Sequence, residues 1–273
     1  DALPIFAEEE ANKMKKFVAL LLAVLMVASL CACGQKDTGS DLQTVTKGKL
    51  IMSTNAEFAP YEYVADDGKG FQGTGYEGID IEIAYALAQK LGLELVVDNM
   101  DFDAALSAVQ TGKSDMVAAG VTVTPDRLNA MSFTDSYANG VQVVIVKEGS
   151  DIKSIDDLQG KKIGTQRGTT GFLYCSDDFG DDNVIGFDDG ATAVQNLKAG
   201  KIDCVVIDNV PAQEYVKANP GLTILDTEYA NEDYAIGIAK DNTALQEALN
   251  KALAELKADG TIQSIIDKYI PAK

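Results

Sequence analysis

From residue 50 onward, segments with the pattern of β-strands alternate with segments with the pattern of α-helices. Such alternation is typical of α/β folds, in which helices cover a mostly parallel sheet. The first series of expected elements is strand 50–53, helix 80–91, strand 93–97, helix 102–110 and strand 116–124. The second is strand 141–146, a short helix after Ser154, strand 162–165, a helix from Thr170, strand 184–187, helix 191–199 and strand 204–207. The two series predict two α/β units of similar build.

An internal repeat supports this division into two units. The segments VQTGKSDMVAAG and NLKAGKIDCVVI align, so that Gly112, Lys113, Asp115 and Val117 match Gly200, Lys201, Asp203 and Val205. In each copy a helix is expected to end at the glycine, and a buried strand to begin two residues later. Turns of this kind are common in α/β proteins, but the equivalent strand ends carry more information. Ligands bind at the carboxyl ends of strands in open parallel sheets.

The N-terminal part has the pattern of a secretory signal. Two lysines follow Met14, and an apolar run covers residues 17–30, which is shorter than the roughly 20 residues of a transmembrane helix. A single-pass anchor is the alternative. The sequence Leu-Cys-Ala-Cys that ends at Cys33 resembles the lipobox of bacterial lipoproteins, which predicts a lipid on Cys33 and attachment to the outer face of the cytoplasmic membrane. We treat residues 1–13 as upstream of the signal.

The expected domain organisation follows from these segments. Residues 1–32 are upstream residues and signal peptide, and residues 33–47 are a lipidated flexible tether rich in small polar residues. Removal of residues 1–32 from the 273 leaves 241, enough for one large domain or two lobes of about 100 residues each. The formal net charge of −19 argues against nucleic acid and anionic lipid surfaces as partners.

Two charged residues follow the repeated strands. Arg127 lies just beyond the first, in VTVTPDR, and Asp208 ends the second. A guanidinium can bind a carboxylate with two hydrogen bonds, and a carboxylate can accept hydrogen bonds from an ammonium group. If the two units face each other, this pair predicts a site for the zwitterion of an α-amino acid. The alternative is that both are helix-end residues in solvent.

Catalytic and metal-binding patterns are weak. The chain contains no histidine, and neither the Ser-x-x-Lys at residues 150–153 nor the Gly-Lys-Ser at 112–114 has the context of an acylating enzyme or a phosphate loop. The acids between residues 177 and 182 lack the spacing of a calcium loop. We therefore expect no catalytic residue, no metal and no cofactor. Cys175 and Cys204 are compatible with a disulfide or with two separate buried thiols.

Seven segments, in order, carry a resemblance to a known family: TNAEFAPYEY, YEGIDIEIA, MDFDAALSAVQTGKSDM, GVTVTPDR, GTQRGTTG, CVVIDN and LKADGTIQSIIDKYI. From Leu50 to its end the chain resembles the polar amino acid family of extracellular solute-binding proteins of ABC transporters. The resemblance implies a type II periplasmic-binding-protein fold, with two doubly wound α/β sheets joined by two hinge strands near residues 136–139 and 227–231. Lobe 1 would comprise residues 48–137 and 231–273, and lobe 2 residues 138–230.

The same resemblance implies a monomeric receptor that clasps an L-amino acid between its lobes and delivers it to a membrane permease. Arg127 would bind the ligand carboxylate, with help from Thr122 and Thr170, and Asp208 would bind the ammonium group, with the Gly120 carbonyl as a second acceptor.

Three further expectations concern the ligand side chain. Phe58 and Phe102 would sandwich it, and Asn55 and Gln166 would contact its far end. Several relatives carry an acid where Asn55 stands; its absence weakens an interpretation as a lysine or arginine receptor but leaves it open, because Glu57 lies close by. Gln166 favours a polar neutral ligand.

Two other classes of protein remain as alternatives. A dehydratase on the same fold would need a proton donor, for which Glu57 is the nearby candidate. A sensory ligand-binding module would normally be fused to a membrane-spanning domain, and no second long apolar segment follows Cys33.

Overall fold

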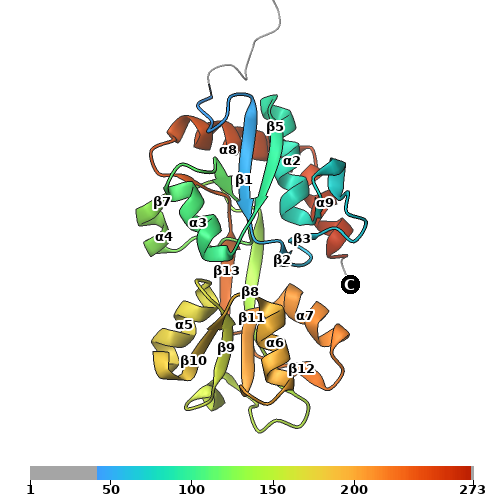
Figure 1. The fold of residues 1–273 in the computed structure, drawn as a ribbon, viewed down its shortest axis with the longest axis vertical. Coiled ribbons are helices and arrows are strands. Elements are labelled where there is room, and N and C mark those ends of the chain that lie inside the picture. Colours follow the sequence, from blue (N-terminus) through green and yellow to red (C-terminus); the bar gives the residue numbers. More distant parts are fainter. Residues whose placement is uncertain (1–41, 272–273) are drawn as a thin grey trace, which may run out of the picture. The chain divides into compact units, whose positions relative to one another are not determined.

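The computed structural model describes residues 42–271, whose strands form two large sheets and one small one (Figure 1). The signal peptide and Cys33 lie outside the described residues. The predicted α/β class with two main sheets is confirmed. No helix in the described part of the chain is long and apolar enough to span a membrane.

The first sheet has the strand order β5-β1-β6-β14-β7. Its strands are β1 (Lys49–Thr54), β5 (Glu94–Asn99), β6 (Met116–Val117), β7 (Met131–Phe133) and β14 (Gly237–Ala239). β1 is parallel to β5 and β6, whereas β14 is antiparallel to its two neighbours. The helices of this lobe are α2 (Ile79–Leu91), α3 (Phe102–Gln110), α4 (Pro125–Ala130), α8 (Thr243–Ala258) and α9 (Thr261–Tyr269). A small sheet of β2 (Glu57–Phe58), β3 (Glu62–Val64) and β4 (Tyr76–Glu77) lies in the same part of the chain, with η1 (Phe71–Gly73) before β4.

Helix α8 illustrates how the sequence builds this lobe. Its leucines recur at helical spacing, so they form one apolar stripe, and Leu245, Leu249 and Leu253 are fully buried. They pack in the same core as Leu50 of β1 and Ile83 of α2. The C-terminal part of the chain thereby completes a lobe that begins near residue 49.

The second sheet has the order β10-β9-β11-β8-β12, with β13 also paired to β8. Its strands are β8 (Ala138–Lys147), β9 (Ile163–Gln166), β10 (Val184–Phe187), β11 (Cys204–Asp208), β12 (Leu222–Ile224) and β13 (Ala230–Tyr234). Its helices are η2 (Ile155–Leu158), α5 (Thr170–Phe179), η3 (Asp181–Asn183), α6 (Gly190–Lys198) and α7 (Asn209–Ala218). β9 is parallel to β10 and β11, but β8 is antiparallel to β11. The predicted strand 141–146 therefore forms, but it runs against the parallel direction of its neighbours.

Strands β8 and β13 run side by side between the two sheets (Figure 1). They pair in antiparallel register from Ala230 opposite Gln142 to Tyr234 opposite Ala138. The predicted lobe limits fall at the start of β8 and within β13.

The predicted strand 116–124 is wrong beyond its first two residues. Only Met116 and Val117 pair in the first sheet, and Thr122 makes an isolated bridge to Tyr234. Gly120 between them has a φ of +54°, which turns the backbone away from an extended path. This departure from the sheet directs residues 119–122 toward the second lobe, where they contribute to the site described below.

The internal repeat is a structural equivalence. Gly112 and Gly200 both follow a helix in the left-handed region, with φ of +70° and +71°. The two aspartates of the repeat then do the same work: Asp115 accepts a hydrogen bond from the Ile51 amide at 2.7 Å, and Asp203 accepts one from the Lys162 amide at 2.8 Å. Each carboxylate thus fixes the neighbouring parallel strand near its start.

The last residues of the expected tether contact the first lobe. The Val45 amide donates to Asp115 Oδ1 at 2.7 Å, and Asn242 Nδ2 donates to the Gln43 carbonyl at 3.0 Å. Asp115 therefore holds both the segment before β1 and β1 itself.

Candidate functional site

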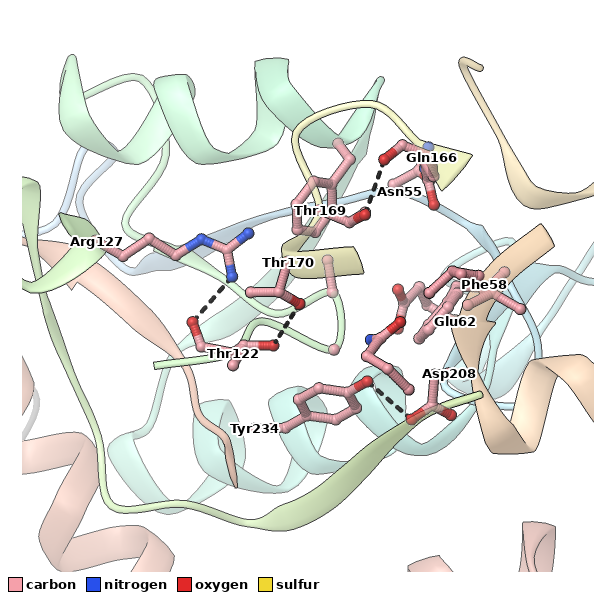
Figure 2. Close-up of a pocket in the computed structure, with 16 residues that line it drawn as sticks. Asn55, Phe58, Glu62, Thr122, Arg127, Gln166, Thr169, Thr170, Asp208 and Tyr234 are labelled. Carbon is pink, nitrogen blue, oxygen red and sulfur yellow. Dashed lines mark hydrogen bonds between the residues drawn. The ribbon is translucent and has the colours of Figure 1, made fainter. Parts of the chain in front are cut away.

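One pocket lies between the two sheets and takes residues from both (Figure 2). The volume of the pocket is about 460 Å³, with its open mouth included. The residues around it are Asn55, Phe58, Glu62, Phe102, Ala119, Gly120, Thr122, Arg127, Gln142, Gln166, Thr169, Thr170, Val206, Ile207, Asp208 and Tyr234. All nine residues predicted as ligand contacts are in this set, so the structure brings them together; their roles stay predictions.

Arg127 reaches the pocket from the short helix α4. Thr124 caps this helix by accepting from the Arg127 amide at 3.2 Å, and Pro125 occupies its first turn. The guanidinium donates to the Thr122 carbonyl at 2.9 Å and to the Gly168 carbonyl of the second lobe at 3.1 Å. It lies 5.4 Å from the centre of the Phe102 ring. These contacts fix the guanidinium and leave some of its five N–H donors free.

The charge of Arg127 is buried. The residue is 9% exposed, and burial lowers the pKa of its guanidinium, although Glu232 and other nearby groups oppose that shift. Among residues 42–271, no carboxylate lies within 4.0 Å of it. The alternative interpretation, in which Arg127 is exposed to solvent, is therefore wrong.

Asp208 approaches from the opposite lobe, at the end of buried strand β11 and the start of α7. Its Oδ1 accepts from the Val210 amide at 2.9 Å, as an N-cap. Its Oδ2 accepts from the Val141 amide and from the Tyr234 hydroxyl, both at 3.0 Å. The side chain is 1% exposed, and burial raises its pKa to about 6 although these three donors act in the opposite direction. This is a second buried charge without an ion-pair partner among the described residues.

Between the two charges, backbone and hydroxyl groups of both lobes approach each other. The hydroxyls of Thr122 and Thr170 are 3.4 Å apart, and Thr170 opens helix α5, whose N-cap is Thr169. A helix N-terminus favours an anion, as the prediction for Thr170 requires. The Gly120 amide donates to Asp80 Oδ2 at 2.9 Å, which orients this turn of the pocket wall.

The far end of the pocket is closed by a pair of amides. Gln166 Nε2 donates to Asn55 Oδ1 at 2.8 Å and to the Asp188 carbonyl at 3.1 Å, while Asn55 Nδ2 donates to the Met100 carbonyl at 3.0 Å. Asn55 belongs to the first lobe and Gln166 to the second, so this hydrogen bond also spans the two lobes.

Acids surround this end. Glu57 is exposed at the rim and does not line the pocket. Desolvation first, and then the negative charges of Asp189, Asp101 and Asp188, raise the pKa of Glu57. Arg167, whose guanidinium lies 3.0 Å from Asp188 Oδ1, balances part of this negative charge.

The predicted aromatic residues occupy different surroundings. Phe58 packs against apolar residues of both lobes and stacks on Tyr61, with ring centres 5.6 Å apart. Phe102 is buried in the core of the first lobe and lies beneath Arg127. Both line the pocket.

Seven lining residues had no place in the sequence prediction: Glu62, Ala119, Gln142, Thr169, Val206, Ile207 and Tyr234. Gln142 and Tyr234 lie on the hinge strands, which are distant in sequence from the pocket motifs. Glu62 stands in a run of alternating polar and aromatic residues that has the pattern of an exposed strand. The strand ends of the repeat were the only signal for Val206 and Ile207.

Other candidate chemistry does not gather at this site. Among residues 42–271, no group of three or more His, Cys, Asp or Glu side chains is arranged to hold a metal ion. Cys175 and Cys204 are both buried in one apolar cluster of the second lobe, and both thiols are free.

Comparison with known proteins covers the same part of the chain as the resemblance found in the sequence. The profile of bacterial extracellular solute-binding proteins, family 3, matches residues 50–272. The chain is 33% identical over 266 residues to the arginine-binding extracellular protein ArtP of Bacillus subtilis, covering 94% of this chain and 98% of that protein. It is 29% identical to the L-cystine-binding protein TcyJ of Escherichia coli, over 92% of this chain and 94% of the relative.

Solved structures give the same result for the fold. An ancestral arginine-binding protein bound to glutamine superposes with a TM-score of 0.77 and 40% identity, covering 83% of this chain and all of that one. ArtJ from Geobacillus stearothermophilus, which binds arginine, lysine and histidine, superposes with a TM-score of 0.76 and 31% identity, over 82% and 96% of the two chains. The type II periplasmic-binding-protein fold is thereby confirmed.

Proposed function

Because the chain belongs to the bacterial extracellular solute-binding proteins of family 3, we propose that it captures an L-amino acid between its lobes and delivers it to the permease of an ABC importer. One observation carries this proposal. A buried guanidinium from one lobe and a buried carboxylate from the other line the same pocket, and neither has an ion-pair partner among the described residues. A zwitterion would supply both missing charges.

The two ends of the pocket suit the two charged groups of an α-amino acid. Arg127, with Thr122 and the start of α5 at Thr170, would bind the carboxylate. Asp208 and the Gly120 carbonyl would bind the ammonium group. Charge-assisted hydrogen bonds contribute roughly 1.5–3 kcal/mol each, so a few at each end reach the roughly −8 kcal/mol of micromolar affinity after ordering costs.

The far end favours a polar side chain that donates hydrogen bonds. Both Nε2 hydrogen bonds of Gln166 are made within the protein, whereas its Oε1 has no protein donor among the described residues although the residue is only 6% exposed. An amide oxygen can only accept a hydrogen bond, so it favours an N–H group over a carboxylate at this end. Arginine and glutamine, which the descriptions of two solved relatives name as ligands, have side chains with N–H donors. We propose a ligand of this kind, with Phe58 and Phe102 beside its aliphatic part.

The proposal is for binding without catalysis. The proton donor predicted for the dehydratase alternative, Glu57, is exposed and lies outside the pocket lining. We further propose that Cys33 is lipidated, so that a monomeric receptor stays near its permease at the outer face of the membrane.

A thermal-shift screen of the protein from Cys33 onward against the standard amino acids and cystine tests this function. A ligand that binds only the folded state raises the melting temperature, and we expect arginine or glutamine to give the largest increase. The absence of a shift with every amino acid would overturn the proposal.

The same ligand then tests the two charges. We expect Asp208→Asn and Arg127→Met each to weaken binding by at least about 2 kcal/mol in titration calorimetry, because one charge of the ligand would be buried unpaired. Asp177→Asn, a change at an exposed acid of the second lobe, is the matched control and should bind as the wild type does. Wild-type affinity in either pocket variant would refute the assigned roles.

A further inference from the structure

One acid of the pocket has no place in the proposed clasp. Glu62 lies on β3, is 0% exposed and lines the pocket. In Figure 2 its label stands between Phe58 and Asp208, at the end proposed for the ammonium group. Neither of its oxygens has a hydrogen-bond donor among the described residues. An ionised carboxylate in that condition is strongly unfavourable.

The neighbour of Glu62 is a second buried acid, Asp80 of α2. Its Oδ2 accepts from the Gly120 amide at 2.9 Å and from the Tyr137 hydroxyl at 2.8 Å, while its Oδ1 has no donor among the described residues. Burial raises the pKa of Asp80 to about 6 although these donors act in the opposite direction, so Asp80 is the member of the pair that is ionised at neutral pH. A proton on Glu62 would give Asp80 the missing donor and would remove the unpaired charge of Glu62.

The other titratable groups around Glu62 give no compensating positive charge. Asp80 of α2, the adjacent Tyr61 and Tyr137 before β8 act on Glu62 directly, and Asp208 and Tyr234 line the same pocket. No lysine or arginine of the described residues forms an ion pair with Glu62. Burial, followed by the charge of Asp80, raises the pKa of Glu62 well above its ordinary value. At neutral pH the pair therefore holds one proton and one negative charge.

We propose that Glu62 is a second carboxyl of the ammonium end, and that the proton it shares with Asp80 passes to the solvent when the ligand's ammonium group binds. The inference rests on the proposed function. A positive charge placed beside the pair favours the ionised form of Glu62. The pocket thus avoids adding the charge of Glu62 to those of Asp80, Asp208 and Glu232 until the ligand brings a balancing positive charge.

Proton release measures this directly. We would titrate the protein from Cys33 onward with L-arginine, and with L-glutamine if arginine does not bind, at about pH 7.5 in buffers of different ionisation enthalpy. Asp208, with a pKa of about 6, is already ionised there. We expect the wild type to release a fraction of a proton per ligand. In Glu62→Gln, whose amide can donate to Asp80 without titrating, release should disappear and affinity should fall about tenfold.

The matched control is Glu247→Gln, an exposed glutamate of helix α8 in the same lobe, which should release protons as the wild type does. Asp80→Asn is the second variant, because its amide can donate to an ionised Glu62; it should also lose the release. If neither variant folds, infrared difference spectra of the wild type remain decisive, since ligand should diminish the C=O band of a protonated carboxyl.

The outcomes separate the two proposals. Failure of every amino acid to bind would overturn the proposed function. Binding with no proton release in the wild type, equal release in Glu62→Gln, or no change in the protonated-carboxyl band would overturn the role of Glu62 and leave the clasp of Arg127 and Asp208 standing.

Discussion

At the scale of single residues, Asp208 combines two tasks that usually belong to different side chains. One oxygen caps helix α7, and the other receives two donors from the hinge strands β8 and β13. The carboxylate is therefore held in one orientation at the pocket wall, although burial opposes its charge. A ligand ammonium group would find it already positioned, which reduces the ordering cost of binding.

The pKa of Asp208, raised to about 6, predicts how affinity depends on pH. A ligand ammonium group binds the ionised carboxyl, so the pKa of Asp208 is lower in the complex than in the free protein. Protons therefore compete with the ligand as the pH falls through about 6. We expect an additional loss of affinity that approaches tenfold per pH unit below that value. Calorimetry from about pH 7.5 to about pH 4.5 measures it.

Two variants separate the groups involved. In Glu62→Gln the steeper loss below about pH 6 should persist, because it belongs to Asp208. In Asp208→Asn it should be smaller, and only the share of Asp80, whose pKa burial also raises to about 6, should remain. A wild-type affinity that stays constant down to about pH 4.5 would show that Asp208 does not bind the positive charge.

The sequence predicts the charged residues of the pocket better than their surroundings. Arg127 and Asp208 follow repeated strands, which gave a physical reason to place them together. Glu62 and Tyr234 could not be found in this way, because their burial results from packing between segments that are far apart in the chain. Local pattern reports which face of an element is apolar, but not which polar residue a distant segment will cover.

At the scale of elements, the pairing of β8 with β13 depends on a glycine. A Cβ atom at Gly140 would lie 2.4 Å from Cζ and 2.5 Å from the hydroxyl oxygen of Tyr234. Tyr234 is 1% exposed and donates to Asp208, so its ring has little freedom to move. Because Gly140 has no side chain, the Tyr234 ring can occupy this space and donate to Asp208.

Substitution of this glycine should affect both stability and binding. We expect Gly140→Ala to lower the free energy of unfolding by about 1–3 kcal/mol, because the buried ring must shift to accommodate the methyl group. Urea denaturation measures this loss, and the affinity for the amino acid should fall with it. A change below about 0.5 kcal/mol would mean that the strands relax around the methyl group at no cost.

Element boundaries agree well where a local signal exists. Ser154 and Asp157 form a capping box at the start of η2, where a short helix was predicted, and Gly92 ends α2 in the left-handed conformation. The predicted strand 116–124 was too long because its apolar residues are buried in a loop that lines the pocket, and burial alone gives the same pattern as a strand.

At the scale of the whole described unit, the two lobes contact each other through the binding residues themselves. Hydrogen bonds from Arg127 to Gly168 and from Gln166 to Asn55 both cross the pocket. A hydrogen bond between the lobes also lies outside its lining: the Tyr215 hydroxyl of α7 donates to the Glu57 carbonyl at 3.3 Å. This contact can stabilise the approach of the lobes without touching a ligand.

Removal of that hydroxyl should therefore change kinetics more than specificity. We expect Tyr215→Phe to weaken binding by about 0.5–1.5 kcal/mol, mainly through faster dissociation, with the same order of preference among amino acids. Stopped-flow fluorescence with a labelled lobe measures the rates. Tyr85→Phe is the matched control, because its hydroxyl makes no hydrogen bond within the described residues. A changed preference in Tyr215→Phe would place this residue in the recognition of the ligand instead.

The division into two α/β units could be inferred from alternation and the repeat, because both are local patterns. The return of the C-terminal helices to the first lobe could not be inferred from them. It depends on the leucine stripe of α8 finding α2, which local pattern cannot specify, and here only the family resemblance predicted it.

The double hydrogen bond of Asp115 has a mechanical consequence. The Asp115 carboxylate accepts from Val45, just before β1, and from Ile51 within β1. The other end of that strand leads into Asn55 and the pocket. A force applied to the chain ahead of residue 42 would act on the start of β1 in the first sheet. It would not act on the hinge strands β8 and β13. The first lobe would then be the attached part of the molecule, and the second lobe could move relative to it about the hinge strands.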